Sequence, residues 1–213
     1  YDRLLLRGPL EMAGEGFARR GVMSFDELAD NAEAEIETRH IRFGDAAAVL
    51  WTSGTTGKPK GVIQSHNVWI RAALNNDRLY GTRPGDVAYN CLPLYNSAAW
   101  VANIYRALST GIPCALDEQF SVSKFWGRIR HYGATQTMTL GAMHMFLWNE
   151  PRRTDDADNP LRVASMVPMP QKLIAPFCER FGLEAIVQGL GQSEVMPILS
   201  KVETPARQCK PNA

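Results

Sequence analysis

The chain has 213 residues, of which 45% are hydrophobic and 21% are charged, enough to bury a core in one large or two small domains. Its 23 Lys and Arg residues nearly balance its 22 Asp and Glu residues, and like charges form no block. A nucleic-acid-binding surface is therefore not expected. No apolar run approaches the ~20 residues that cross a bilayer, and no signal-peptide pattern is present, so we expect a cytoplasmic protein without a membrane span.

The cysteines and histidines form no metal-binding or disulfide pattern. They are Cys91, Cys114, Cys178 and Cys209, and His40, His66, His131 and His144. No Cys-x-x-Cys pair occurs, and no histidine lies near a cysteine at ligand spacing. We therefore expect reduced cysteines, and neither a zinc site nor a Ser-His-Asp triad.

Residues 1–44 form a poorly patterned lead-in segment. One short helix is predicted from Ser24 to about Ile36, because Ser24 can cap it and Glu27 follows three positions later. The chain begins with Tyr1 rather than Met and ends in polar residues, so we expect it to be a piece of a longer protein.

Residues 45–213 alternate between strand-length apolar segments and segments of helical period. The predicted strands are 46–51, 86–92, 112–116, 135–140, 161–167 and 184–187, and the predicted helices are 66–78, 98–108, 121–131, 143–148 and 171–181. Such alternation indicates an α/β fold of layered helices around a substantially parallel sheet.

The segment Trp51–Val62 has the composition of a phosphate-binding loop. Its glycines allow backbone N–H groups to approach an anion, its hydroxyls donate hydrogen bonds, and its lysines supply charge. Only two residues separate Gly54 from Gly57, and Pro59 follows Lys58, so this is not a Walker A loop. A flexible turn between two strands is the structural alternative. We expect the loop at the carboxyl end of strand 46–51, where α/β sheets bind ligands.

The run Thr52–Gly61 resembles the phosphate-binding signature of the adenylate-forming superfamily, which includes acyl-CoA synthetases, luciferases and the adenylation domains of peptide synthetases. The resemblance implies that the loop holds the β- and γ-phosphates of ATP. It implies that Lys60 is the fixed, catalytic countercharge and that Thr52 also contacts Mg²⁺. The implied nucleotide-binding residues of this loop are Thr52, Ser53, Gly54, Thr55, Thr56, Gly57 and Lys60.

A second segment, Gln188–Glu194, resembles the Tyr-Gly-x-Thr-Glu motif of the same superfamily, although alone it could be a strand-to-helix turn with a cap. The resemblance implies that Glu194 is catalytic and binds Mg²⁺, a cation that prefers oxygen ligands, and that Ser193 donates to the α-phosphate. The implied nucleotide-binding residues are Gly189, Leu190, Gly191, Gln192 and Ser193. Leu190 replaces the tyrosine that stacks on adenine, and Met166–Pro170 lacks the glycines that border adenine in the family.

A third segment, Leu92–Trp100, resembles the Pro-Leu-Phe-His segment beside the acyl group, with Asn96 in place of the histidine. The implied substrate-contacting residues are Tyr95, Asn96, Trp100 and Gly141. A strand end entering a buried helix explains Tyr95 equally well. Within the superfamily the closest likeness is to crotonobetaine/carnitine-CoA ligase, based on Phe125–Gly127 and Phe177–Gly182. A quaternary ammonium substrate would be met by an aromatic box, for which Trp51, Tyr95 and Trp100 are candidates.

The resemblance implies an AMP-forming acid-thiol ligase that uses ATP, Mg²⁺ and coenzyme A to activate a small-molecule carboxylic acid. The chain is expected to be an incomplete N-terminal domain, without the C-terminal domain and its lysine, and to be inactive by itself. Three alternatives stay open: a non-catalytic, degenerate nucleotide-binding module, an NTPase or phosphotransferase, and an adenylation domain that loads a carrier protein. Homo-oligomer formation also stays open.

Overall fold

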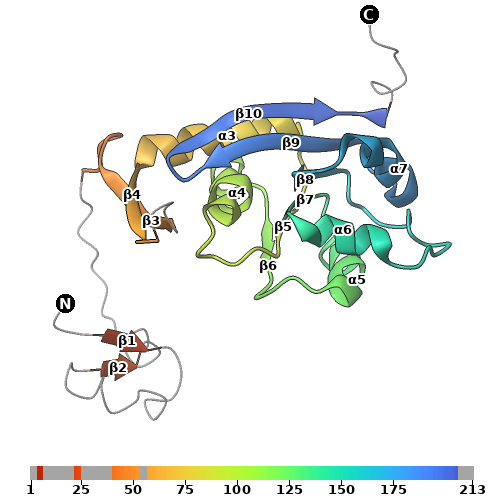
Figure 1. Cartoon of the computed structure of the whole chain (residues 1–213), viewed down its shortest axis with the longest axis horizontal. Coiled ribbons are helices and arrows are strands. Elements are labelled where there is room, and N and C mark those ends of the chain that lie inside the picture. The colour runs from red at the N-terminus through yellow and green to blue at the C-terminus, as the bar shows by residue number, and fades with distance from the viewer. Residues whose placement is uncertain (1–3, 7–21, 25–39, 53–56, 206–213) are drawn as a thin grey trace, which may run out of the picture. The chain divides into compact units, whose positions relative to one another are not determined.

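The computed structural model describes residues 4–6, 22–24, 40–52 and 57–205 (Figure 1). The chain divides into two compact units, Tyr1–Ile41 and Arg42–Ala213. In the first unit, strands β1 (Leu4–Leu6) and β2 (Val22–Ser24) pair in parallel. The helix predicted from Ser24 falls mostly outside the described residues, and Ser24 itself ends β2.

The second unit is built on a six-stranded sheet with the order β10-β9-β8-β7-β5-β6 (Figure 1). Its strands are β5 (Ala88–Asn90), β6 (Cys114–Leu116), β7 (Gln136–Leu140), β8 (Val163–Val167), β9 (Ala185–Gln192) and β10 (Val195–Glu203). The pairings among β5 to β9 are parallel, whereas β10 runs antiparallel to β9. The predicted α/β fold with a substantially parallel sheet is thus confirmed.

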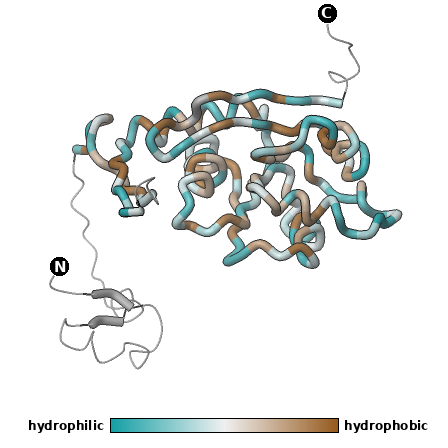
Figure 2. Tube along the Cα trace, in the orientation of Figure 1, coloured by the Kyte–Doolittle hydropathy of each residue, from teal (hydrophilic) through white to brown (hydrophobic). Residues whose placement is uncertain are grey.

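Helices cover both faces of the sheet. They are α3 (His66–Tyr80), the π-helical η2 (Ala99–Ile104), α4 (Tyr105–Thr110), α5 (Val122–Tyr132), α6 (Ala142–Asn149) and α7 (Gln171–Phe181). Side chains alternate between faces along a strand, so Val163 of β8 packs with Tyr80 of α3, while Ala164 and Met166 pack in the larger core with α5, α6 and α7. This packing on both faces gives a layered helix-sheet-helix arrangement. In Figure 2 the loop after α6 is coloured mainly as hydrophilic.

The first motif differs from its predicted setting. Strand β3 (Ala46–Thr52) confirms the strand predicted at 46–51, and the motif follows its carboxyl end as predicted. However, β3 pairs with β4 (Lys60–Ser65) in a separate, antiparallel, two-stranded sheet, so the expected place in the parallel sheet is wrong. The physical reason is the short connection, which permits a hairpin, whereas parallel neighbours need a long crossover. Residues 53–56 of the loop lie outside the described residues.

The second motif also differs from the strand-to-helix alternative, because β9 runs through it and turns back into β10. The sequence did not predict β10, since a proline at position 197 is unfavourable in a central strand, but an edge strand tolerates it. Gly189 faces Ser200 across the two strands, and a Cβ there would lie 2.9 Å from the carbonyl oxygen of Leu199. Close strand approach therefore explains this glycine.

Within the described ranges, no helix has both the length and the apolar character that crossing a membrane requires.

Candidate functional site

A hydrogen bond links the first motif hairpin to the second motif turn. The Nε2 of Gln64, a residue of β4 that is buried, donates to the carbonyl oxygen of Ser193, between β9 and β10. Gln64 and Ser193 are 129 positions apart in the sequence, so only the fold brings these two motifs together.

A cavity of about 330 Å³ lies beside this turn. Its lining residues come from α3, the segment before η2, η2 itself, the end of β7 and the β9–β10 hairpin: Ala72, Asn76, Asn96, Ser97, Ala98, Val101, Leu140, Gly191, Gln192, Ser193 and Met196. Asn96, predicted to contact the acyl group, therefore lines the same cavity as three residues predicted to contact the nucleotide: Gly191, Gln192 and Ser193. We call it the Asn96 cavity.

Tyr95 and Trp100 line a different cavity of about 610 Å³, together with Trp51. Its inner wall is an aromatic cluster in which the ring centroid of Trp69 lies 5.8 Å from that of Trp100 and 5.1 Å from that of Tyr105. The three aromatic residues expected to form a box thus line one cavity, which we call the aromatic cavity. Trp69, which the sequence analysis did not single out, is buried, and its Nε1 has no hydrogen-bond partner among the described residues.

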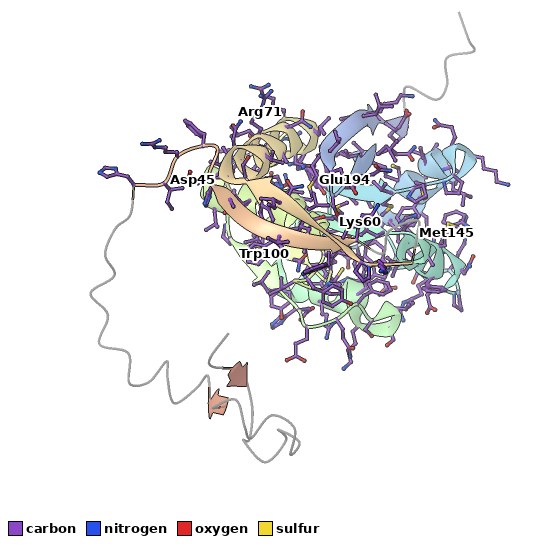
Figure 3. All side chains as sticks on the ribbon, turned by 60° about the vertical axis from the view of Figure 1, so that its left-hand side comes forward. Asp45, Lys60, Arg71, Trp100, Met145 and Glu194 are labelled. Carbon is purple, nitrogen blue, oxygen red and sulfur yellow. The ribbon has the colours of Figure 1, made fainter. Side chains whose placement is uncertain are left out.

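Glu194 lies exposed on the turn between β9 and β10 and lines a third cavity, of about 430 Å³, with Arg71 and Asn75 of α3. Lys60 begins β4, is exposed and faces Thr52 across the hairpin. In Figure 3, Lys60 on the β3–β4 hairpin, Glu194 and Arg71 are labelled, and Trp100 lies below the hairpin in this view.

The donor set suits magnesium better than a metal held by protein ligands alone. No three His, Cys, Asp or Glu side chains gather as a metal site among the described residues. Mg²⁺ keeps several waters and usually binds one or two carboxylates plus substrate phosphates. The single exposed carboxylate of Glu194 fits that mode.

The turn after β8 is fixed by two side chains. His144 of α6 donates through Nε2 to the carbonyl oxygen of Pro168, at 2.8 Å, while its Nδ1 accepts from the hydroxyl of Thr139, at 3.1 Å. The side-chain oxygen of Gln188 accepts from the backbone N–H of Met169 at 3.1 Å. The Met166–Pro170 turn is thereby held at the carboxyl end of the sheet without the family's glycines.

His144 makes stability depend on pH. Burial lowers the pKa of the imidazole below its ordinary value, and the hydrogen bond to Pro168 only partly opposes this. The unfolded chain therefore binds more protons than the native one below about pH 6.5, and the free energy of unfolding falls as pH decreases through that value.

Urea titrations between pH 5 and 8 should show a shallower pH dependence of the free energy of unfolding for His144→Gln, which is also expected to be less stable than the natural protein. Exposed His131, replaced by Gln, is the control, and equal slopes for His144→Gln and the natural protein would contradict the prediction.

The remaining predicted residues are placed as follows. Ser53, Gly54, Thr55 and Thr56 lie outside the described residues. Gly141 lines neither the Asn96 cavity nor the aromatic cavity in the described part of the chain. Leu190 is exposed on β9 opposite Leu199. No sequence motif pointed to four further residues of the candidate site, because residues inside regular helices and strands give no motif signal: Gln64, Asn76, Val101 and Met196.

Residues 12–213 match the AMP-binding enzyme family. Long-chain fatty acid transport protein 1 of Homo sapiens is 30% identical over 165 residues, which are 78% of this chain and 26% of that protein. The medium/long-chain-fatty-acid–CoA ligase FadD17 of Mycobacterium tuberculosis is 32% identical over 182 residues, 85% of this chain and 36% of the ligase. The chain thus spans about a quarter to a third of these curated relatives.

A solved structure is also similar to this chain. O-succinylbenzoate coenzyme A synthetase (MenE) of Bacillus subtilis, in complex with ATP and a magnesium ion, superposes with a TM-score of 0.77 at 25% identity, over 96% of this chain and 42% of the synthetase. The fold is that of the N-terminal domain of acyl-CoA synthetases, as the motifs predicted. The chain belongs to the AMP-binding enzyme family, within the adenylate-forming superfamily.

Proposed function

We propose that the protein to which this chain belongs activates a carboxylic acid with ATP, forming an acyl-adenylate and releasing pyrophosphate. The thiol of coenzyme A then takes the acyl group and AMP leaves. The observation that carries the proposal is the Asn96 cavity, which joins the residue predicted beside the acyl group to Gly191, Gln192 and Ser193 of the nucleotide motif. An acid and the α-phosphate must meet in one place for adenylation, and alignment supplies much of the rate.

Each residue has a role in this proposal. Lys60 neutralises charge on the polyphosphate, and Ser193 donates to the α-phosphate. Glu194 would hold Mg²⁺, and the bound cation would supply positive charge that offsets the negative charge of the phosphates. Thr52 and the hydroxyl-bearing loop after it complete the phosphate site. Coenzyme A is the proposed acceptor thiol, and no residue of the chain becomes covalently modified.

A carnitine-like acid is the second candidate for the substrate. What favours it is the aromatic cavity lined by Trp51, Tyr95 and Trp100, since aromatic faces bind quaternary ammonium groups. No charged side chain lines this cavity among the described residues.

The test is exchange of labelled pyrophosphate into ATP by the whole protein, with a panel of carnitine, crotonobetaine, fatty, aryl and amino acids. Exchange that depends on one class of acid supports adenylation. Formation of the CoA thioester then separates an acyl-CoA ligase from an enzyme that loads a carrier protein. ATP binding without exchange for any acid would favour the degenerate binding module, and release of orthophosphate an NTPase.

Substitution of Leu190 tests the adenine side. Leu190 is exposed on β9, and in the proposed site it contacts adenine only through apolar atoms. Leu190→Tyr is expected to tighten ATP binding by about fivefold to tenfold, since stacking of an aromatic ring adds roughly 1 kcal/mol. Calorimetric titration with ATP measures the change, and Leu199→Tyr, at the facing exposed position of β10, is the matched control. Equal affinity in the natural protein and Leu190→Tyr would remove position 190 from the adenine site.

A further inference from the structure

We propose that the Asn96 cavity selects a short carboxylic acid whose acyl chain carries a neutral hydrogen-bonding group, a hydroxyl or an amide. This inference rests on the proposed function, and it names the class of acid. Three properties of the cavity carry it: the free polar atoms of two asparagines, the absence of charge, and the volume.

The two asparagines that line the cavity each use one half of their amide. The Oδ1 of Asn96 accepts from the backbone N–H of Ala98 at 2.8 Å, which leaves its Nδ2 as a donor. The Nδ2 of Asn76 donates to the carbonyl oxygen of Ala72 at 2.9 Å, which leaves its Oδ1 as an acceptor. Neither the Nδ2 of Asn96 nor the Oδ1 of Asn76 forms a hydrogen bond with another group of the described residues. Together they offer one donor and one acceptor, which a hydroxyl or an amide satisfies and an alkyl chain does not.

The cavity carries no charge of its own. Among the described residues that line it there is no Lys, Arg, His, Asp or Glu, and Arg71 and Glu194 line the neighbouring cavity instead. A second carboxylate or a quaternary ammonium would lose its hydration there without gaining a counter-ion. The Asn96 cavity therefore disfavours dicarboxylates and carnitine-like acids, and the carnitine-like second candidate would have to bind in the aromatic cavity instead.

The volume of the Asn96 cavity favours a short acyl chain. At roughly 30 Å³ for each water-sized group, about 330 Å³ holds about ten non-hydrogen atoms. Ala72 and Val101 are buried in helix packing, so the wall that they form cannot easily retreat. This is the small end of the range for ligand pockets, about 300–1,000 Å³. A long-chain fatty acid would exceed it.

The experiment compares acids of equal size in pyrophosphate exchange by the whole protein. Glutaramate and 3-hydroxyhexanoate carry a neutral polar group, glutarate carries a second charge, and hexanoate carries neither. We expect kcat/KM for glutaramate or 3-hydroxyhexanoate to exceed that for glutarate and hexanoate by at least about tenfold. Palmitate and carnitine are expected to react least.

Two variants test the assignment to this cavity. Asn76→Leu keeps the side-chain size, and it should bring the ratio between 3-hydroxyhexanoate and hexanoate to within about twofold. Val101→Ala should shift the preferred acid toward greater length. Asn149→Leu, on the exposed end of α6, is the matched control and should leave every ratio unchanged.

The outcomes separate the two proposals. Preference for hexanoate, palmitate, glutarate or carnitine overturns the substrate class while adenylation stands. An unchanged ratio in Asn76→Leu overturns the role of this cavity. Absence of exchange with every acid in the panel, by protein that binds ATP, overturns the proposed function itself.

Discussion

Glu194→Gln is expected to slow pyrophosphate exchange by about a hundredfold or more, while the thermal unfolding midpoint stays within about 1 °C of the natural value. The substitution keeps the volume of the side chain and removes only its charge. Glu194 is exposed on a turn, and no described residue forms an ion pair with it, so stability does not depend on it. In the proposed site the carboxylate holds Mg²⁺ at the phosphates, and loss of one preorganised stabilising group typically costs about 10²–10³ in rate.

The measurement is exchange rate against Mg²⁺ concentration for the whole protein. If Glu194 holds the metal, the Glu194→Gln curve moves to higher Mg²⁺ and is partly restored there. Glu118→Gln, at an exposed position after β6, is the matched control. A Glu194→Gln rate and Mg²⁺ dependence equal to those of the natural protein would remove this residue from the metal site.

Arg180→Met is expected to produce the largest loss of stability, about 3–5 kcal/mol, or a fall of about 10 °C in the unfolding midpoint. The side chain of Arg180 is only 4% exposed, and its Nε lies 2.7 Å from a carboxylate oxygen of Asp156. The guanidinium also donates to the carbonyl oxygens of Trp148, Glu150 and Pro151, so it ties the loop after α6 to α7. Without it, these carbonyl oxygens lose a donor, and the mostly buried carboxylate loses its counter-ion and keeps, among the described residues, only the backbone N–H of Arg153.

Thermal unfolding and urea titration measure this effect, and a second change identifies its cause. Adding Asp156→Asn to Arg180→Met removes the unpaired charge and should recover part of the stability. Arg153→Met is the control, because the ion pair of Arg153 with Asp155 is exposed and should contribute little. A change in the midpoint no larger for Arg180→Met than for Arg153→Met would contradict the prediction.

Much of the fold followed from local patterns. The alternation of segments from Ala46 to Val187 predicted the helices and the parallel strands, because burial on one or both faces imposes a period of 3.6 or 2 on the chain. The strands β4 and β10 were not predicted, and β3 was predicted as a strand but without its antiparallel partner. Whether two strands pair parallel or antiparallel depends on the path of the chain between them, and the local composition of each strand does not indicate that path.

The sequence by itself determined the family, because two motifs with fixed chemistry lie at fixed positions: the glycine- and hydroxyl-rich run from Thr52 to Gly61, and the segment that ends in Glu194. Both motifs can be recognised in the sequence because their chemistry requires particular residues. Glycine lets the backbone approach an anion, and a carboxylate binds a metal ion.

Only the tertiary structure decided which side chains share a cavity. It separated Tyr95 from Asn96, although they are neighbours in the sequence, and it brought Asn76 and Gln192 to the same cavity. The physical reason is that Tyr95 and Asn96 lie in the turn before η2, where neighbouring side chains reach different cavities, while α3 and the β9–β10 hairpin pack beside that turn. The size and polarity of a pocket therefore come from packing between distant segments, and with them comes the choice of acid.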